Sequence, residues 1–401
     1  MHGYDAVYDV STSGDQIIRL YTNGTPTSAR HILLANLEGN GNIASRIRVF
    51  PPPDDTNYYD SVGELIWKLG IPILLLLGTF GNVSCLIVMT KNDPRVPTHL
   101  LLSCLAIFDT LGLYIGLSRY WVFYLTDGID IWTFSEAVCK FGHFFVYYLL
   151  QCSSWILVAV TIERFIVTCA PIHAKTMTTT RNAVIALVTM FIALFILNSH
   201  YFHTVELIIT RKNETLCWSE DLHNRLFLDR TWALIDLTVY SLVPLVIIFV
   251  CNVSIIVKVR VSHRRTSCGN ARVVPNRQKR ISSMTAMLVT VNFVFMITTL
   301  PISIYVIVFY QKGKDYLHLE VKNSQNREQI LDSNAILWPL LNLLQYSNNA
   351  LNFYLYCISG PRFREQYSQL FRRFSNRIAP NPSETTAARI VETPPIERDK
   401  F

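Results

Sequence analysis

Seven long apolar stretches constrain the fold of this chain more than any other feature of its sequence. Each reaches the roughly 20 residues that a helix needs to cross the hydrocarbon core of a bilayer, and each has few charges in its middle. Half of the 401 residues are apolar and only 16% are charged, which is unlike an ordinary soluble domain. We therefore predict an all-α membrane protein, a seven-transmembrane helix bundle within residues 65–358. The predicted spans are residues 65–90, 98–125, 137–170, 183–207, 233–257, 284–310 and 335–358.

Lys and Arg in the short loops predict the orientation of the spans, because these residues favour the cytoplasmic side. Residues 258–283 contain eight of them and no acid, whereas residues 126–136 contain three acids and no base. The first of these loops is therefore predicted to be cytoplasmic, and the N-terminus extracellular. The net charge of +7 then follows from topology and from a surface that faces anionic membrane lipid, so it predicts no nucleic-acid partner.

Three segments outside the spans complete the predicted organisation. Residues 1–64 are polar, contain three consecutive prolines and show no sustained helical or strand period, so we expect a flexible extracellular arm. Residues 359–374 intersperse aromatic residues with arginines, which fits a short amphipathic helix on the membrane surface. Residues 375–401 have the polar, proline-rich composition of a disordered cytoplasmic tail, which is either a phosphorylated docking signal or inert.

Cys139 and Cys217 are the two cysteines, out of nine, that lie on the predicted outer side. An oxidising exterior favours a disulfide between them, which would tie the top of the third span to the loop after the fourth. Asn23 and Asn213 begin glycosylation sequons on the same side. Because such sequons are common by chance, an unmodified asparagine is the alternative at each position.

A carboxylate, Asp109, lies near the middle of the second predicted span, where an ionisable residue costs roughly 2.5–3.5 kcal/mol on insertion scales. We expect polar side chains from three other spans to gather around it, namely Asn82, Ser153, Asn348, Asn349 and Asn352. Such a group suits a hard monovalent cation such as an allosteric sodium ion, or a proton when the ion leaves. The alternative is a hydrogen-bond network that only joins the helices. No other cofactor is predicted.

Short motifs recur in a fixed order along the spans. They are Gly81-Asn82, Leu105-Ala106 with Asp109, Trp132-Thr133-Phe134 before Cys139, Arg164 25 residues after that cysteine, Pro171 seven residues later, Pro244, Phe295 with Pro301, Asn352 with Tyr356, and Phe363. Over about residues 65–374 the chain therefore resembles rhodopsin-like (class A) G-protein-coupled receptors. Each motif alone is weak, and their joint order is what makes the resemblance specific.

The resemblance implies a role for the Glu-Arg pair, Glu163 and Arg164, at the inner end of the third span. In this family the glutamate holds the arginine at rest, and activation frees it as helix six swings outward and opens a pocket for a heterotrimeric G protein. Pro171, Asn352 and Tyr356 belong to the same switch by resemblance. Electrostatics supports a two-state pair, because the carboxylate compensates the guanidinium in a low-dielectric setting. The alternative is a plain arginine that snorkels at the membrane edge.

Several positions depart from the family pattern. Phe165 and Asn252 replace tyrosines, Phe353 replaces the proline of the span-seven motif, and Thr299 replaces a tryptophan two residues before Pro301. Ile281 stands where some members have an acid that locks the arginine to helix six. We therefore expect a resting lock that is weaker or differently built, which leaves room for high basal activity.

Two residues that known ligand classes require are missing from this chain. Amine receptors of this family have an aspartate seven residues after the span-three cysteine, where this chain has Val146. Light receptors have a lysine six residues before the asparagine of the span-seven motif, where this chain has Tyr346. Neither residue can pair with an ammonium or form a Schiff base, so both ligand classes are excluded.

The outer half of the predicted bundle has aromatic, charged and polar residues that suit a peptide. The candidate ligand-binding residues are Arg119, Tyr120, Val146, Tyr147, Gln151, Asp236, Tyr305, Trp338, Asn342 and Tyr346. Asp236 would pair with a basic group of the ligand and Arg119 with a carboxylate or carbonyl. The alternative is that each charge pairs with another residue of the chain.

These patterns together predict a multi-pass neuropeptide receptor of the plasma membrane that activates a heterotrimeric G protein. Arrestin and receptor kinases are expected as further partners, and no enzymatic activity is expected. One alternative is a non-signalling decoy or scaffold receptor, because the motifs of spans six and seven are altered. A transporter or channel is the other alternative, although no internal repeat or continuous polar pore is evident.

Overall fold

The structure is a computed structural model in which part of the chain is described. The backbone is described for residues 5–9, 17–21, 33–34, 55–91, 96–126, 128–209, 215–268, 276–305 and 324–378. Side chains are described for residues 60–91, 96–126, 128–209, 215–261, 287–305, 335–361, 363–370 and 372. The chain divides into two compact units, one of residues 1–66 and 323–338 and one of residues 67–322 and 339–401.

The first unit contains three short strands, in a region for which the sequence shows no sustained strand period. β1 (Asp5–Asp9), β2 (Ile17–Tyr21) and β3 (Leu33–Leu34) form an antiparallel sheet in the order β1-β2-β3. The register pairs Asp5 with Tyr21 and Ile17 with Leu34. β3 has only two residues, and the sequences of β1 (DAVYD) and β2 (IIRLY) do not alternate between apolar and polar residues, which explains the missing signal.

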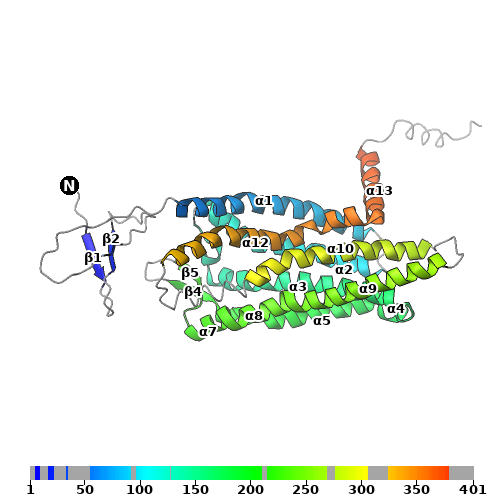
Figure 1. Cartoon of the computed structure of the whole chain (residues 1–401), viewed down its shortest axis with the longest axis horizontal. Helices are drawn as coiled ribbons and strands as arrows, with labels where there is room; N and C mark the ends of the chain where they lie inside the picture. The colour runs from blue at the N-terminus through cyan, green and yellow to red at the C-terminus, as the bar shows by residue number, and fades with distance from the viewer. Residues whose placement is uncertain are drawn as a thin grey trace, which may run out of the picture. The chain divides into compact units, whose positions relative to one another are not determined.

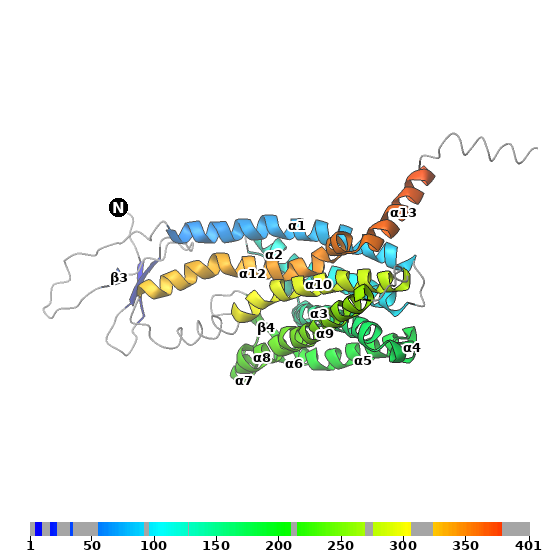
Figure 2. The same ribbon diagram turned by 45° about the vertical axis from the view of Figure 1, so that its right-hand side comes forward.

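The rest of the described chain is mostly helical. Its long helices are α1 (Asp55–Thr90), α2 (Pro97–Leu125), α3 (Glu136–Cys169), α5 (Thr180–Asn198), α9 (Val243–Cys268), α10 (Asn276–Tyr305) and α12 (Ser324–Ser359). Short elements join them: η1 (Ile131–Thr133), α4 (Pro171–Met177), α6 (Tyr201–Thr204), β4 (Glu206–Ile209), β5 (Thr215–Trp218), α7 (Leu222–Leu226), η2 (Phe227–Trp232), α8 (Ala233–Asp236), η3 (Leu237–Leu242) and α13 (Pro361–Ile378). Figures 1 and 2 show the long helices running side by side, with α3 contacting α2, α5, α9 and α10.

Six described helices are long and apolar enough to cross a membrane. They cover residues 60–90, 97–125, 136–169, 180–204, 222–261 and 287–305. α12 covers the seventh predicted span, residues 335–358, but its mean hydropathy there is lowered by Asn342, Gln345 and three further asparagines. These six to seven candidate spans agree with the predicted seven-helix bundle.

The fifth span differs from the single helix that was predicted for residues 233–257. It begins at Leu222 with α7 and passes through two π-helical turns, η2 and η3, before α9 continues to Cys268. π-Helical turns are rare, occur mostly as single turns inside α-helices and are frequent at functional sites. The four-residue helix α8 between them ends at Asp236, so the two irregular turns flank the predicted ligand-binding carboxylate.

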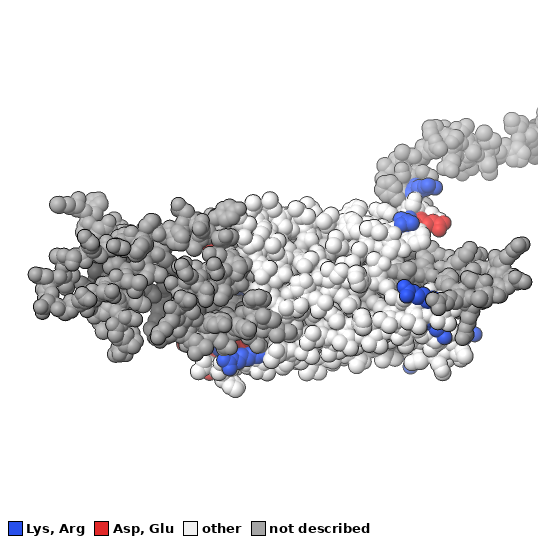
Figure 3. All heavy atoms as spheres, in the orientation of Figure 1, with Lys and Arg blue, Asp and Glu red and all other residues white. Residues whose placement is uncertain are grey.

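The surface of the bundle is apolar along its middle. Large apolar side chains point outward there, among them Leu76 at 73% exposure and Ile196 at 66%. Figure 3 shows that the described atoms in the middle of this face include no charged residue, and that Lys and Arg appear towards the ends. In water this would be an aggregation-prone surface, whereas the hydrocarbon of a bilayer solvates it.

The core of the bundle is formed by residues of α1, α2, α3, α5, α9, α10 and α12. Ile156, Ile248, Val291 and Phe295 are fully buried in it. α13 turns away from the direction of α12, as both ribbon views show (Figures 1 and 2). The ring of its Phe363 packs 5.7 Å from that of Phe353, which anchors the start of α13 on the bundle.

Candidate functional site

Glu163 and Arg164 form a buried ion pair near one end of α3. Arg164 donates from Nε to Oε2 of Glu163 at 2.6 Å and from Nη2 to Oε1 at 2.9 Å. The two residues are 8% and 6% exposed. Adjacent residues of a helix do not face each other, so the long arginine side chain must turn back to reach its neighbour. The guanidinium is therefore compensated locally, within α3.

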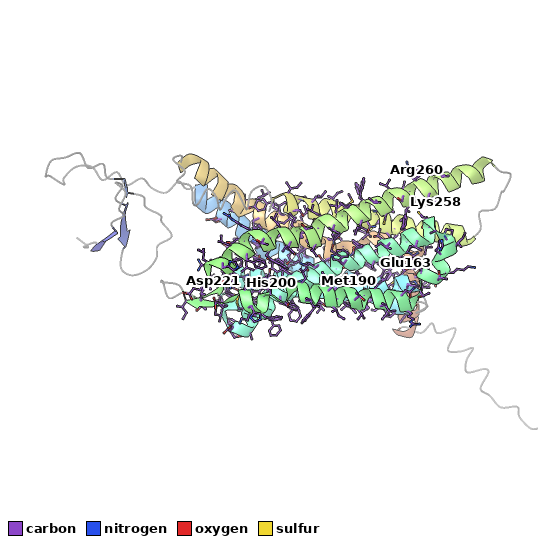
Figure 4. The ribbon with its side chains drawn as sticks, turned by 90° about the horizontal axis from the view of Figure 1, so that it is seen from below. Glu163, Met190, His200, Asp221, Lys258 and Arg260 are labelled. Atoms are coloured by element: carbon purple, nitrogen blue, oxygen red, sulfur yellow. A yellow bond between two sulfur atoms is a disulfide. The ribbon has the colours of Figure 1, made fainter. Side chains whose placement is uncertain are left out.

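Thr98, near the start of α2, connects this pair to a second helix. Its hydroxyl donates to Oε2 of Glu163 at 3.0 Å, and the residue is fully buried. Figure 4 places Glu163 towards the same end of the bundle as Lys258 and Arg260, away from His200 and Asp221 at the other end. The charges that were predicted to mark the cytoplasmic side and the Glu-Arg pair thus lie at one end.

A second polar cluster surrounds Asp109, which is fully buried in α2. Its Oδ1 accepts hydrogen bonds from the Ser153 hydroxyl and from Nδ2 of Asn349 at 2.8 Å, while Oδ2 accepts one from Nδ2 of Asn352 at 2.7 Å. Asn82 of α1 donates to the Asn349 carbonyl at 3.1 Å. The cluster therefore joins α1, α2, α3 and α12 around one carboxylate.

The asparagines of this cluster have buried amide oxygens that accept no hydrogen bond among the described contacts. The Oδ1 atoms of Asn82, Asn349 and Asn352 have no hydrogen-bond partner among the described residues. Asn348, the remaining predicted member, is also buried but makes no hydrogen bond to this cluster among the described contacts. Three amide oxygens and a carboxylate are the hard oxygen ligands that an alkali or alkaline-earth cation prefers. The donor set therefore fits a cation such as sodium better than it fits a network of hydrogen bonds alone, which would leave these oxygens unsatisfied.

A third cluster includes Asp236, which is half-buried between the two π-helical turns of span five. Nε2 of Gln151 donates to its Oδ1 at 2.8 Å, and Nδ2 of Asn198 donates to Oε1 of Gln151 at 2.7 Å. Gln151 and Asn198 are fully buried. This relay from α5 through α3 fixes one oxygen of the carboxylate and leaves its negative charge without a cation among the described contacts.

Arg119 makes its contacts within the chain instead. It donates from Nε to Oδ1 of Asp130 at 3.0 Å and from Nη2 to Oδ2 at 2.6 Å, and its guanidinium lies 4.0 Å from the ring centroid of Trp132. Oδ1 of Asp130 also accepts from the Trp132 backbone N–H at 3.0 Å. Arg119 is therefore paired with another residue of the chain, which was the alternative to a ligand contact.

Cys139 and Cys217 form the predicted disulfide. The sulfur atoms lie 1.95 Å apart, and the bond joins α3 to β5. β5 pairs with β4 in an antiparallel hairpin in which Cys217 lies opposite Leu207. His143 lies within 4.8 Å of both sulfurs, but oxidised sulfurs offer no thiolate to a metal ion, so these three residues do not form a metal site.

A comparison with known protein families decides the class of this molecule. The 7 transmembrane receptor (rhodopsin family) matches residues 81–356, which is more than half of the chain. The chain belongs to this family. As a member of the rhodopsin family with several apolar helices, it is a multi-pass protein of the plasma membrane, and its family is one of receptors rather than enzymes.

Known relatives of this rhodopsin-family receptor include peptide receptors by name. The galanin receptor 2b of Danio rerio is 22% identical over 79% of this chain and 77% of its own length. The galanin receptor type 1 of Mus musculus is 21% identical over 91% and 97%. The C-C chemokine receptor 1-like protein 1 of Mus musculus is 24% identical over 80% and 85%.

The remaining predicted residues of the receptor differ in where they lie. Tyr147 stacks on Tyr201 with centroids 5.1 Å apart, and Tyr120 stacks on Trp67 at 4.5 Å, so both rings pack within the bundle. Several others lie in the bundle half-buried or buried: Val146, Tyr305, Asn342, Tyr346 and Tyr356. Pro171 begins α4 at the surface, and Trp338 belongs to the first compact unit. Asn23, Asn213 and the side chain of Ile281 lie outside the described residues.

Sequence reasoning missed several of the receptor's buried polar side chains, including Thr98, Asn198 and Asn292. Each is a polar residue inside one of the predicted spans. That position is the signal that could have identified them, because an amide or hydroxyl inside a bilayer must find an interhelical or backbone partner.

Proposed function

We propose that this chain is a receptor for an extracellular peptide and that it activates a heterotrimeric G protein when the peptide binds. Membership of the rhodopsin family supports receptor function, and the buried Glu163–Arg164 pair is the observation that carries the coupling role. The galanin receptors among the relatives are named for a peptide, which supports a peptide ligand here. We further propose an extracellular N-terminus, an extracellular disulfide and a cytoplasmic α13 on the inner leaflet, with no enzymatic activity.

The ligand contacts that we propose centre on Asp236. Its carboxylate is held by Gln151 and has no cation among its described contacts, so a lysine, arginine or amino terminus of the ligand would complete it. Arg119 is already paired with Asp130, so its proposed part is to hold the wall of the site beside Trp132 rather than to bind a ligand carboxylate. Val146, Tyr147, Tyr305, Asn342 and Tyr346 would supply the apolar and polar surroundings.

The proposed signalling step is a change of partner at the inner end of α3. At rest, Glu163 neutralises Arg164 and is itself held by Thr98. Outward movement of α10 on ligand binding would admit a segment of the G protein, whose contacts would draw Arg164 away from Glu163. Arrestin and receptor kinases would act afterwards on the cytoplasmic face and tail.

A screen tests this proposal directly. Cells that express the full chain would be exposed to a panel of amidated neuropeptides while calcium and cyclic nucleotides are measured together. A concentration-dependent response that is absent from untransfected cells is the expected result. Saturable peptide binding to the cells without any change in calcium, cyclic nucleotides or G-protein nucleotide exchange would instead support the decoy receptor.

We also propose that the Asp109 cluster binds a sodium ion, which would stabilise the resting arrangement of α1, α2, α3 and α12. Asp109 and the unpartnered oxygens of Asn82, Asn349 and Asn352 are the proposed ligands. An ion that binds only the folded protein raises its stability by RT ln(1 + [ion]/Kd), about 1.4 kcal/mol at ten times the Kd. The purified wild-type protein should therefore unfold at higher temperature in sodium chloride than in choline chloride.

Asp109→Asn should remove that difference between the two salts, because the charged ligand is lost. Ser154→Ala is the matched control, since Ser154 is a buried hydroxyl of α3 that donates to the Tyr240 carbonyl, outside the cluster. It should keep the full sodium effect. Equal unfolding temperatures of the wild type in both salts would mean that the cluster is only an interhelical hydrogen-bond network.

A further inference from the structure

One buried amide, Asn292, joins the inner half of α10 to two other helices. Its Nδ2 donates to Oγ1 of Thr161 in α3 at 2.9 Å and to Oδ1 of Asn252 in α9 at 3.1 Å. Asn292 and Thr161 are 1% exposed and Asn252 is 8% exposed. The helices α3, α9 and α10 therefore meet at one side-chain NH₂ group.

The contacts of Thr161 indicate the direction of these hydrogen bonds. Its hydroxyl proton is donated to the Leu157 carbonyl at 2.8 Å, so its oxygen faces Asn292 as an acceptor. An amide NH₂ group has two protons, and here both are used. With the amide of Asn292 turned over, its Oδ1 would face an oxygen whose proton is already donated to Leu157, so the present orientation is favoured. Both donors of Asn292 thus serve contacts between helices.

The position of Asn292 along α10 places the contact below a hinge. Pro301 lies inside α10 and cannot donate the backbone hydrogen bond that a helix interior requires, which favours bending at the preceding turn. Asn292 lies nine residues before it, on the side towards the inner end. Its acceptor Thr161 lies three residues before Arg164, so the two share a face of α3.

The buried residues next to Asn292 on α10 are apolar, so its polar contact differs from theirs. Met287, Leu288, Val291 and Phe295 are buried apolar residues. Contacts between apolar side chains have little directional preference, and lipid is as good a partner for them as another helix. A hydrogen-bonded amide, by contrast, specifies one arrangement of the three helices, because it has no alternative partner while the surroundings are dry.

We propose that Asn292, Thr161 and Asn252 form a resting clamp that holds the inner half of α10 against α3 and α9. This inference rests on the proposed function, in which outward movement of α10 opens the receptor to its G protein. The clamp is the differently built lock that an isoleucine at position 281 leads us to expect. Opening of α10 breaks both hydrogen bonds of Asn292 at once, and water that enters the opened end takes their place.

Hydrogen–deuterium exchange of the purified, ligand-free full chain tests the clamp without any G protein. Asn292→Leu keeps a similar volume but removes both donors, and Thr161→Val removes the acceptor with little change of shape. Interhelical hydrogen bonds in membranes have modest strength, so each variant should speed amide exchange in the inner half of α10 by about three- to tenfold. In the Thr161→Val background, Asn292→Leu should add less than it does alone.

Ser303→Ala is the matched control. Ser303 also links α10 to the fifth span, by donating to the Ser241 hydroxyl at 2.8 Å, but it lies on the other side of Pro301. It should leave exchange in the inner half of α10 unchanged. If Asn292→Leu fails to fold, Thr161→Val and Asn252→Leu give the same readout.

Basal nucleotide exchange on a panel of G proteins is the second measurement, and it should rise by a similar factor in the clamp variants. Unchanged amide exchange in Asn292→Leu and Thr161→Val, or a change no larger than that of Ser303→Ala, would overturn the clamp. Faster amide exchange without basal activity on any G protein would support the clamp and count against the proposed coupling instead. The two proposals can therefore fail separately.

Discussion

Arg164→Ala should reduce peptide-stimulated nucleotide exchange to the unstimulated level while the receptor still reaches the cell surface. The guanidinium is the one cation of the Glu-Arg pair, and we propose that it changes partner from Glu163 to the G protein. Without it, ligand binding and exchange lose their coupling, which in allosteric proteins typically spans about 5- to 150-fold. Peptide binding and exchange would be measured on the same membranes.

Two further variants separate signalling from stability. Alanine at position 164 leaves the Glu163 carboxylate buried with Thr98, and an uncompensated buried charge lowers stability, so fewer receptors of the single variant than of the wild type should reach the surface. The double variant Glu163→Gln/Arg164→Ala removes both charges and should be expressed well but remain inactive. Arg181→Ala changes an exposed arginine of α5 and should signal normally. Full stimulated exchange in the double variant would remove Arg164 from the switch.

The sequence predicts the helices of this receptor well because a bilayer imposes one strong requirement on every span. The chain must bury or pair all its backbone polar groups for about 20 residues, so hydropathy alone locates helices such as α2 and α3. The disulfide could be predicted for a similarly simple reason. Cys139 and Cys217 are the two cysteines on the predicted outer side, and they are bonded in the structure.

Contacts between helices are much harder to predict from the sequence. The cluster around Asp109 was predicted as a group because it contains an expensive charge, yet the sequence does not reveal that Asn82 reaches Asn349 rather than the carboxylate. Rotation of each helix by a fraction of a turn decides such pairings. Thr98 and Asn292 were missed for this reason, as they are ordinary polar residues until a partner helix faces them.

The length of an apolar stretch also does not predict local irregularities of the helix. The π-helical turns before and after Asp236 change the rotation of span five, and no residue type in Phe227–Trp232 or Leu237–Leu242 marks them. Arg119 is a similar case, because its partner Asp130 and the ring of Trp132 lie in the segment after α2, where the hydropathy pattern gives no geometry. Charge alone suggested a ligand contact there, whereas geometry favours an internal ion pair.

Asp236→Asn should weaken binding of a peptide with a basic group by about 30-fold, which corresponds to roughly 2 kcal/mol, the lower end for losing one partner of a desolvated charge pair. Asparagine keeps the shape of the side chain and can still accept the hydrogen bond from Gln151, so the receptor should fold normally. A peptide analogue in which the basic residue is replaced by a neutral one of similar size should bind the wild type and the variant equally. Competition binding with both peptides measures the difference.

Glu220 provides a control for Asp236, because it is exposed and the proposed topology places it on the same side of the membrane. Glu220→Gln removes an exposed carboxylate between β5 and α7, so it reports any loss that comes from weaker long-range attraction of a cationic peptide. That loss should disappear at high salt, whereas the effect of Asp236→Asn should persist because a half-buried contact is screened less. If Asp236→Asn weakens the basic and neutral peptides equally, the carboxylate serves the Asn198–Gln151 relay of the bundle and does not recognise the ligand's charge.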